Sequence, residues 1–347
     1  MENHNHEAKA NQNYLCNSLP EVLVLEPPPV FKFHGDQLSK RFHFLKAWES
    51  PLPLHQYLTI HSQSVQALLS SGRNPITSEI IQLLPSLGII VTPSAGLNHI
   101  DLQECRRRQI SIVTAGTLYS EDVADLAVGL LIDVFKKIST ADRYVRHGLW
   151  ASQPDYQFPL GSKFLFYISI YSFLGGKQVG IVGLGSIGLN VAKRLEAFGC
   201  NILYNSRQKR PSIPYPYYSD VCDLAALCDV LIICCGLTDE TRHMINKEVL
   251  LAMGKEGVII NVGRGPIIDE KEMVGCLVQG EIAGAGLDVF ENEPCVPKEL
   301  VQLDNVVLSP HKAVHSEETL MALCDLVVGN FEAFFSKKPL LTPLVDY

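Results

Sequence analysis

The feature that most constrains this chain is a glycine-rich stretch at residues 179–193, which reads VGIVGLGSIGLNVAK. Its first part belongs to an apolar run over residues 178–182, which is typical of a buried strand. After the glycines, apolar residues recur at helical spacing: Ile187, Val191 and Leu195. The stretch therefore predicts a strand, a tight turn and a helix in direct succession.

The glycines of this turn, Gly183, Gly185 and Gly188, have the G-x-G-x-x-G spacing of dinucleotide-binding sites. The first permits the tight turn, the second lets a pyrophosphate approach the backbone, and the third lets helix and strand pack closely. The start of the helix, at Ser186 and Ile187, offers free N–H groups and a partial positive charge to the phosphates. This spacing alone is a weak signal, but between a strand and a helix it predicts a dinucleotide site.

Length and composition fit a globular protein of two domains. The chain has 347 residues, of which 47% are hydrophobic and 19% charged. A formal net charge of −8 leaves no basic footprint, so we expect neither nucleic acid nor membrane as a partner. Residues 1–13 are polar and lack the apolar core of a signal peptide. The ten cysteines form no C-x-x-C pair, so we expect reduced thiols, no metal site and a cytoplasmic protein.

Apolar runs of strand type and helical repeats locate the individual elements. Strands are expected at residues 21–26, 65–69, 87–91, 109–113, 178–182, 201–204, 230–234, 258–262, 283–287 and 305–308. Helices are expected at residues 77–84, 121–147, 186–198, 220–227, 246–253, 269–279 and 316–336. Because strands and helices alternate, the sequence predicts an α/β fold with parallel sheets.

The same alternation suggests how the chain divides. We expect a flexible leader at residues 1–20 and a dinucleotide-binding domain at 120–316. Residues 21–119 together with 317–347 would form a discontinuous substrate domain. The long helix at 121–147 would bridge the two domains.

One stretch, residues 164–174 (FLFYISIYSFL), does not fit this scheme. It is strongly apolar, yet it stands where a polar connector is expected, and it is too short to span a membrane. We interpret it as translated intron or an error of the gene model. A hydrophobic lid or a dimer contact is the alternative.

The loop after the second strand of the nucleotide unit decides which dinucleotide is expected. In NAD-binding proteins, an acidic residue about 20 positions past the glycines holds the ribose 2′-OH. Here residues 204–210 read YNSRQKR and contain no carboxylate. Ser206 can hydrogen-bond, and Arg207 can pair with a 2′-phosphate. We predict NADP(H) as the preferred cofactor and NAD(H) as the second choice, with a solvated basic loop as the alternative reading.

Three further stretches follow expected strands at their carboxyl ends, where ligands bind in open α/β sheets. They read NVGRGPIID at 261–269, GLDVFENEP at 286–294 and SPHKAVH at 309–315. Arg264 can grip a carboxylate through two hydrogen bonds, and His311 can donate a proton to a carbonyl oxygen. Glu293 would fix the tautomer of the imidazole and favour its protonated form. This set fits hydride transfer to a 2-oxo acid.

These motifs resemble those of the D-2-hydroxyacid dehydrogenase family, from about residue 21 to the end. The resemblance rests on TPSAGLNHIDL at 92–102, DVADLA at 122–127, the glycine turn, LTDETR at 237–242, GRG at 263–265, LDVF at 287–290 and SPH at 309–311. Within the family, the motifs are most similar to those of plant glyoxylate/hydroxypyruvate reductases and hydroxyphenylpyruvate reductases.

The resemblance implies a role for each matching residue. The catalytic residues would be Arg264, Glu293 and His311. Asp288 would contact the nicotinamide amide, Thr238 and Val262 would line the nicotinamide ribose, and Ser206 and Arg207 would hold the 2′-phosphate. The N–H groups of Ala95 and Gly96 would bind the substrate carboxylate. The family also implies two Rossmann-like domains with parallel sheets, an active site in the interdomain cleft, and a homodimer formed through the helix at 121–147.

We therefore predict an NADPH-preferring reductase of small 2-oxo acids, with hydroxypyruvate and glyoxylate first. The products would be D-2-hydroxy acids, with hydride from the nicotinamide and the proton from His311. Two alternatives stay open. One is a hydroxyphenylpyruvate reductase, and the other is a non-enzymatic, dinucleotide-sensing protein like the corepressors of this family.

Overall fold

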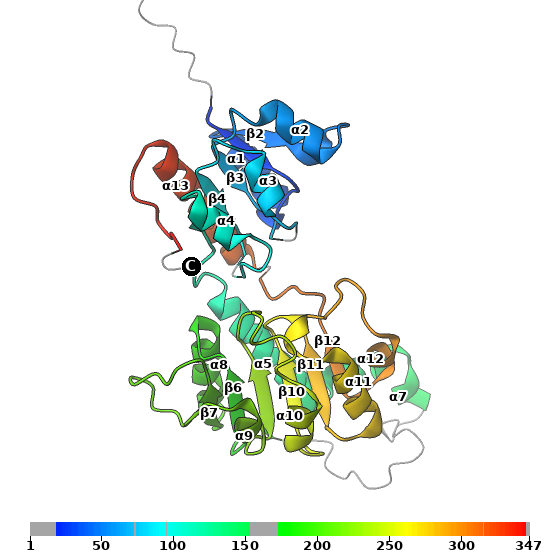
Figure 1. The fold of residues 1–347 in the computed structure, drawn as a ribbon. Coiled ribbons are helices and arrows are strands. Elements are labelled where there is room, and N and C mark those ends of the chain that lie inside the picture. The colour runs from blue at the N-terminus through cyan, green and yellow to red at the C-terminus, as the bar shows by residue number, and fades with distance from the viewer. Residues whose placement is uncertain (1–18, 73, 95, 153–172, 315, 345–347) are drawn as a thin grey trace, which may run out of the picture. The chain divides into compact units, whose positions relative to one another are not determined.

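The computed structural model describes residues 19–152, 173–314 and 316–344, except residues 73 and 95. The chain forms two compact units, residues 1–115 with 321–347 and residues 116–320. Each unit contains one parallel sheet with helices packed on it, as Figure 1 shows. The predicted α/β fold with two parallel sheets is confirmed.

The first unit has a sheet in the order β2-β1-β3-β4-β5. Its strands are β1 (Glu21–Val24), β2 (His43–Lys46), β3 (Ala67–Leu69), β4 (Ile89–Val91) and β5 (Ser111–Val113). Its helices are α1 (Pro29–Ser39), the 3-10 turn η1 (Ala47–Glu49), α2 (Leu54–His61), α3 (Ser78–Gln82), α4 (Leu102–Arg107) and most of α13 (Glu317–Phe335). Leu23, Leu68 and Ile90 pack toward α2, α3 and α4 in one apolar cluster. Phe42 stacks edge-on against Phe331 of α13.

Two capping details show how the sequence starts the helices of this unit. The Thr77 hydroxyl accepts a hydrogen bond from the Ile80 N–H, so the expected cap of α3 is confirmed. Residues 27–29 are three prolines, and α1 begins at the last of them, Pro29. Proline suits the first helical position because its φ is preset and the missing N–H has no intrahelical partner there.

The second unit has a sheet in the order β12-β11-β10-β9-β6-β7-β8. Its strands are β6 (Gln178–Val182), β7 (Asn201–Asn205), β8 (Tyr217–Tyr218), β9 (Val230–Ile233), β10 (Val258–Asn261), β11 (Gly284–Leu287) and β12 (Val306–Leu308). Its helices are α5 (Ser120–Lys136), α6 (Ile138–Arg146), α7 (Leu149–Ser152), α8 (Ser186–Ala197), α9 (Val221–Ala225), α10 (Lys247–Ala252), η2 (Gly265–Ile267), α11 (Glu270–Gln279) and α12 (Lys298–Gln302). Because β6 lies between β7 and β9, the chain winds in opposite directions on its two sides. Ligands bind at the carboxyl ends of the strands beside such a switch point.

Helices cover both faces of this second sheet. On one face, α5 approaches β11 closely because Gly284 and Gly286 have no side chain there. A Cβ at Gly286 would lie 3.0 Å from Leu130 Cβ, and one at Gly284 would lie 3.0 Å from Val134 Cγ1. On the other face, α9, α10 and α11 close over a buried apolar cluster that includes Leu231.

The prediction of a single helix over residues 121–147 is wrong. The chain breaks into α5 and α6 at Lys137, which adopts a left-handed conformation with φ +53°. Asp133 favours the break, because its side chain accepts the Ser139 N–H at the start of α6, at 2.8 Å. A side-chain acceptor at the start of a new helix competes with continuation of the old one.

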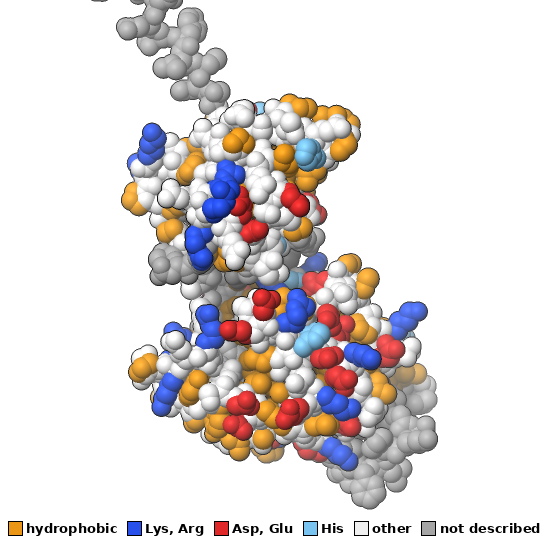
Figure 2. Space-filling view, viewed as in Figure 1, with side chains coloured by type: hydrophobic (Ala, Val, Ile, Leu, Met, Phe, Trp, Pro, Cys, Tyr) orange, Lys and Arg blue, Asp and Glu red, His pale blue; other side chains and the backbone are white. Residues whose placement is uncertain are grey.

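The other expected elements appear with ends shifted by at most three residues. The elements that were not expected are β2, β8, α1, α2, α4, α7, α12 and the 3-10 turns η1 and η2. Over the described part of the chain, no helix has the length and apolar composition needed to cross a bilayer. On the face of the second unit seen in Figure 2, Lys and Arg side chains are interspersed with Asp and Glu side chains.

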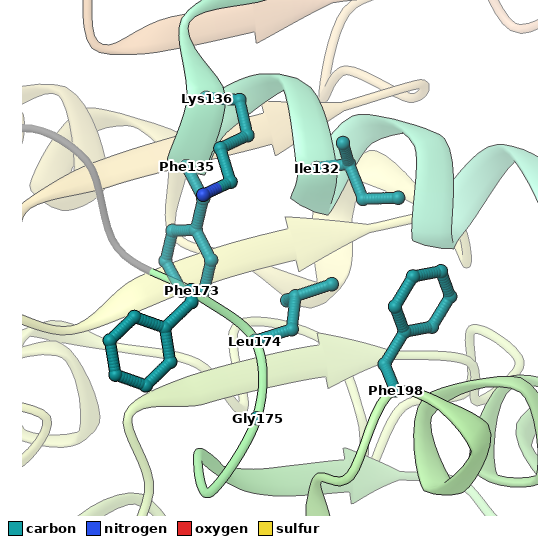
Figure 3. A pocket seen from close by; sticks show the side chains of 7 residues that line it. All are labelled: Ile132, Phe135, Lys136, Phe173, Leu174, Gly175 and Phe198. Atoms are coloured by element: carbon teal, nitrogen blue, oxygen red, sulfur yellow. The ribbon is translucent and has the colours of Figure 1, made fainter.

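Of the apolar stretch at 164–174, residues 164–172 lie outside the described residues, so its interpretation stays a prediction. Its last two residues are described. Phe173 is 74% exposed, whereas Leu174 is buried in an apolar hollow with Ile132, Phe135 and Phe198 (Figure 3). Leu174 precedes β6 and so lies at the amino edge of the sheet, opposite the edge where ligands bind.

Candidate active site

The glycine turn leaves space for a ligand at one of its three glycines. Gly183 has φ +92°, and a Cβ there would lie 2.6 Å from the Cys235 backbone. A Cβ at Gly188 would lie 2.3 Å from the Gly183 carbonyl oxygen, so α8 packs on β6 only with glycine. Around Gly185 no heavy atom lies within 4 Å of such a Cβ. The turn thus has two tightly packed glycines and one open glycine, as a pyrophosphate cradle requires.

The first residues of α8 present backbone donors beside this open space. Gly185 is the N-cap of α8 and supplies no side chain to satisfy the first N–H groups of the helix. The Ser186 hydroxyl is engaged with Ser120 of α5 at 2.7 Å, so Ser186 faces the ligand site through its backbone. Ile187 follows in the same turn. A helix start of this kind binds phosphate oxygens.

The basic loop after β7 is anchored on the glycine turn. Tyr204 is fully buried, and its hydroxyl accepts the Arg210 N–H at 2.9 Å. The Arg210 guanidinium donates to the Leu184 carbonyl within the turn. Arg207 is exposed, and the Ser206 hydroxyl donates to a backbone carbonyl two residues on. From the sequence we assign a role to Arg207 and none to Arg210, although the same run of basic residues points to both.

His311 and Glu293 form a hydrogen-bonded pair at the carboxyl edge of the sheet. His311 Nδ1 lies 2.7 Å from Glu293 Oε2, and Glu293 Oε1 accepts the Phe290 N–H at 3.1 Å. Burial raises the pKa of the Glu293 carboxyl, but the bond to His311, its charge, the Phe290 N–H and nearby Arg264 outweigh burial, so the net pKa is lowered. The carboxylate stays ionised and holds Nδ1, which directs His311 Nε2 outward as the free nitrogen for chemistry.

Arg264 follows β10 in a loop that a buried asparagine organises. Asn261 is 1% exposed, its Nδ2 donates to the Arg264 carbonyl at 3.1 Å, and its Oδ1 accepts the Gly263 N–H at 3.0 Å. Burial lowers the pKa of the Arg264 guanidinium, and the charge of Glu293 opposes this shift. Sequence reasoning assigned no role to Asn261, although it opens the NVGRG motif.

Asp288 ties the end of β11 to the loop that carries His311. It is 1% exposed, and its Oδ1 accepts hydrogen bonds from the Ser309 hydroxyl at 2.6 Å and the Lys312 N–H at 3.0 Å. Its carbonyl accepts the His311 N–H at 2.8 Å. His311 has φ +53°, so these bonds hold the histidine in a left-handed conformation that L-residues rarely adopt.

The remaining predicted residues differ in their surroundings. Val262 is buried after β10, and Thr238 is exposed in a turn where its N–H donates to the Thr241 hydroxyl at 2.8 Å. Gly96 belongs to the first unit, where its N–H donates to the Ser94 hydroxyl at 3.1 Å, so this donor already has an acceptor. Ala95 lies outside the described residues. Among the residues that the structure describes, no group of three His, Cys, Asp or Glu side chains is placed to hold a metal ion.

Comparison with known proteins assigns this chain to a family. Residues 128–313 match the model of the D-isomer specific 2-hydroxyacid dehydrogenase, NAD binding domain. The matched model covers more than half of the chain.

Individual relatives cover nearly the whole chain. The glyoxylate/hydroxypyruvate reductase HPR3 of Arabidopsis thaliana is 53% identical, over 94% of this chain and 98% of its own. The hydroxyphenylpyruvate reductase of Plectranthus scutellarioides is 44% identical, over 93% and 98%. The structure of the NADPH-dependent glyoxylate/hydroxypyruvate reductase of Sinorhizobium meliloti, in complex with NADP and malonate, matches with a TM-score of 0.83 and 35% identity, over 94% and 97%. The chain therefore belongs to the D-isomer specific 2-hydroxyacid dehydrogenase family, as the motifs predicted.

Proposed function

We propose that this protein is an NADPH-preferring reductase of small 2-oxo acids, with hydroxypyruvate and glyoxylate as its substrates and D-2-hydroxy acids as its products. The observation that carries the proposal is the pair formed by His311 Nδ1 and Glu293 Oε2 at 2.7 Å, beside the Arg264 loop. Membership of the family supports it, as does the similarity to two plant reductases that are 53% and 44% identical and are named for these substrates.

Each residue of the set has a distinct task in this reaction. The Arg264 guanidinium would hold the substrate carboxylate in two parallel hydrogen bonds. The His311 imidazolium would donate the Nε2 proton to the carbonyl oxygen, while Glu293 holds Nδ1 and stabilises the cation. The bound nicotinamide supplies the hydride to the carbonyl carbon. Asp288 would use Oδ2 for the nicotinamide amide, because its two bonds to the His311 loop use Oδ1. The Ala95 N–H would assist at the substrate carboxylate, and the Gly96 N–H would do so after exchanging its Ser94 acceptor for the carboxylate.

One assay tests the reaction and the role of the acid. NADPH oxidation is followed with hydroxypyruvate, glyoxylate and 4-hydroxyphenylpyruvate for the wild type, His311→Ala and His147→Ala. We expect His311→Ala to lower kcat by about 10²- to 10⁴-fold, which is the usual contribution of a general acid. His147 is an exposed histidine near the end of α6, and its variant should match the wild type.

The outcomes separate the alternatives. Undiminished turnover by His311→Ala would remove His311 as the acid. Faster turnover of 4-hydroxyphenylpyruvate than of hydroxypyruvate would favour a hydroxyphenylpyruvate reductase, to which a 44% identical relative points. Absence of turnover in a wild type that binds NADPH would favour a dinucleotide-sensing protein.

The preference for NADPH would come from the basic loop on the glycine turn. Ser206 and Arg207 would hold the 2′-phosphate, and Arg210, anchored on Leu184, would add positive charge at the same place. We expect Arg207→Ala to raise KM for NADPH by about 10- to 100-fold, as loss of a charge-assisted hydrogen bond predicts, and to leave KM for NADH nearly unchanged. Lys209→Ala removes a charge from the same loop and should have a much smaller effect. Equal losses for NADPH and NADH in Arg207→Ala would contradict the assignment.

We further propose a homodimer that forms through the region around α6. This helix and α7 carry exposed apolar side chains: Ile138, Val145, Leu149 and Trp150 are 53%, 53%, 38% and 61% exposed. Apolar side chains that gather on a surface in this way mark interaction sites. Light scattering should give the mass of a dimer for the wild type and of a monomer for Val145→Glu with Trp150→Glu. A monomeric wild type would refute the proposal.

A cytoplasmic location fits the cysteine chemistry. The nine cysteines that the structure describes are all free thiols, and such thiols persist in reducing compartments. A fluorescent fusion should therefore show diffuse cytoplasmic signal, and accumulation in an organelle would contradict this proposal.

A further inference from the structure

Three residues outside the proposed catalytic set of Arg264, Glu293 and His311 are linked by hydrogen bonds: His243, Glu270 and Glu291. Glu270, the first residue of α11, is 8% exposed, and its Oε2 accepts the Glu291 N–H at 3.0 Å. Glu291 Oε1 in turn lies 2.8 Å from His243 Nε2. The proposed reaction uses none of the three.

The Arg264 loop packs against the peptide bond between Phe290 and Glu291, whose N–H donates to Glu270. A Cβ at Gly265 would lie 1.9 Å from the Phe290 carbonyl carbon and 2.4 Å from the Glu291 nitrogen. Only glycine permits such a close approach. The amide on the other side of Phe290 donates to Glu293 Oε1 at 3.1 Å. A shift of this peptide would therefore move both the arginine loop and the carboxylate that holds His311.

His243 connects the same two loops from the other end. Its N–H donates to the Pro266 carbonyl at 2.8 Å, directly beyond Gly265, while its imidazole contacts Glu291. It adopts φ +51°, a left-handed conformation that L-residues rarely adopt unless their surroundings hold them. The two contacts of His243 supply that hold.

Two carboxylates, those of Glu270 and Glu291, lie close together in this network. Burial raises the pKa of the Glu270 carboxyl, and the charge of nearby Glu291 adds to the rise, while the Glu291 N–H lowers it. The two carboxylates repel each other, and the N–H donor and the His243 imidazole oppose this repulsion. Removal of the Glu270 carboxylate or of the His243 imidazole would therefore leave the Phe290–Glu291 peptide without one of the contacts that hold it.

We propose that Glu270, Glu291 and His243 are positioning residues that set the spacing between the Arg264 clamp and the Glu293–His311 pair. The inference rests on the proposed function, because it concerns the alignment of a substrate carboxylate with the proton donor. Small displacements of such groups have large effects on rate, since about 1 Å of misplacement can cost 10²-fold.

The test compares Glu270→Ala, Glu270→Gln and His243→Ala with the wild type and with Glu272→Gln. Glu272 stands two residues further along α11 and pairs with Lys247 instead, at 3.8 Å, so it serves as the matched control. We measure kcat and KM for hydroxypyruvate, the dissociation constant of NADPH, the Tm, and the imidazole NMR signal of His311, assigned through His311→Gln. The NMR signal is read without turnover.

Glu270→Ala should lower kcat/KM for hydroxypyruvate by about 10- to 100-fold, as loss of an outer positioning contact predicts, and should shift the His311 signal. NADPH affinity should stay within about twofold of the wild type, because the glycine turn is separate. Glu270→Gln should restore most of the activity, since its amide oxygen also accepts the Glu291 N–H. His243→Ala should show the same pattern as Glu270→Ala.

Wild-type kcat/KM in both Glu270→Ala and His243→Ala would overturn the inference. So would an equal loss in Glu270→Gln and Glu270→Ala, or a parallel loss of NADPH affinity. If Glu270→Ala fails to fold, the comparison of Glu270→Gln with His243→Ala decides, because only the second should lose activity. If the wild type reduces no 2-oxo acid, the proposed function fails, while an unshifted His311 signal in the variants separately refutes the network.

Discussion

At the residue scale, the candidate site pairs groups that are poor catalysts when isolated. A half-exposed histidine acquires a defined tautomer only because Glu293 Oε2 lies 2.7 Å from its Nδ1. The carboxylate is itself held by the Phe290 N–H, and Asp288 binds the His311 loop through Ser309. The Glu293 carboxylate and the His311 imidazole are thus each held by further contacts, which fix their direction.

The lowered pKa of Glu293 predicts how stability responds to acid. A carboxyl whose pKa is lower in the folded chain stabilises the fold above its ordinary value, here 4.5, and this stabilisation is lost as pH falls through the folded pKa. We expect the difference in unfolding free energy between the wild type and Glu293→Gln to shrink as the pH falls from about 5 to about 3. Urea unfolding at each pH measures it. A difference that grew toward low pH would contradict the ionised pair.

At the element scale, the strand–turn–helix unit of residues 178–197 separates packing from binding. Gly188 is a packing position, since its Cβ would lie 2.3 Å from the Gly183 carbonyl oxygen. Gly185 is an open position, with no heavy atom within 4 Å. The two glycines of one motif therefore serve different purposes, which their spacing in the sequence does not distinguish.

Substitution of these two glycines should produce opposite phenotypes. We expect Gly188→Ala to destabilise the fold by about 1–3 kcal/mol, because α8 must move away from β6. Gly185→Ala should leave the stability nearly unchanged and weaken NADPH binding, because its methyl group occupies the space for the pyrophosphate. Chemical unfolding and NADPH titration of both variants measure the two effects. Equal NADPH affinity of Gly185→Ala and the wild type would show that the pyrophosphate does not lie there.

At the scale of the whole molecule, the chain passes between two units with separate sheets and separate cores. The units are joined near residues 115 and 320, so unfolding of one need not unfold the other. Each unit contains one tryptophan: Trp48 lies in η1 of the first and Trp150 in α7 of the second. The two tryptophans can therefore report on the two units separately.

NADPH should stabilise the unit that contains the glycine turn. At a concentration 100 times its Kd, a ligand adds about 2.7 kcal/mol to the stability of the state that binds it. In Trp48→Phe, the fluorescence of Trp150 follows the second unit, and we expect NADPH to raise its unfolding temperature. In Trp150→Phe, the fluorescence of Trp48 follows the first unit, and we expect NADPH to raise its unfolding temperature less. Thermal unfolding with fluorescence detection measures both. A larger shift for Trp48 would place the dinucleotide in the other unit.

Local sequence patterns were sufficient to predict much of the fold of this protein. The strand–glycine–helix unit, the alternation of elements and the positions of the motifs after strand ends follow from apolar periodicity and glycine spacing. These are properties of neighbouring residues, because apolar periodicity and helix-start signals are read within a single segment. The helices α1 and α2 were not predicted, because their apolar pattern is too brief to be recognised in the sequence.

Other features depend on residues that meet only in the folded chain. Contiguous motifs were enough to predict the fold class, the dinucleotide turn and the proposed catalytic residues Arg264, Glu293 and His311. Only the folded chain revealed the Arg210–Leu184 contact and the network of Glu270, Glu291 and His243. In each of these, backbone groups of one segment are satisfied by side chains or carbonyls of another, and such pairing depends on distances in space that spacing along the chain does not specify.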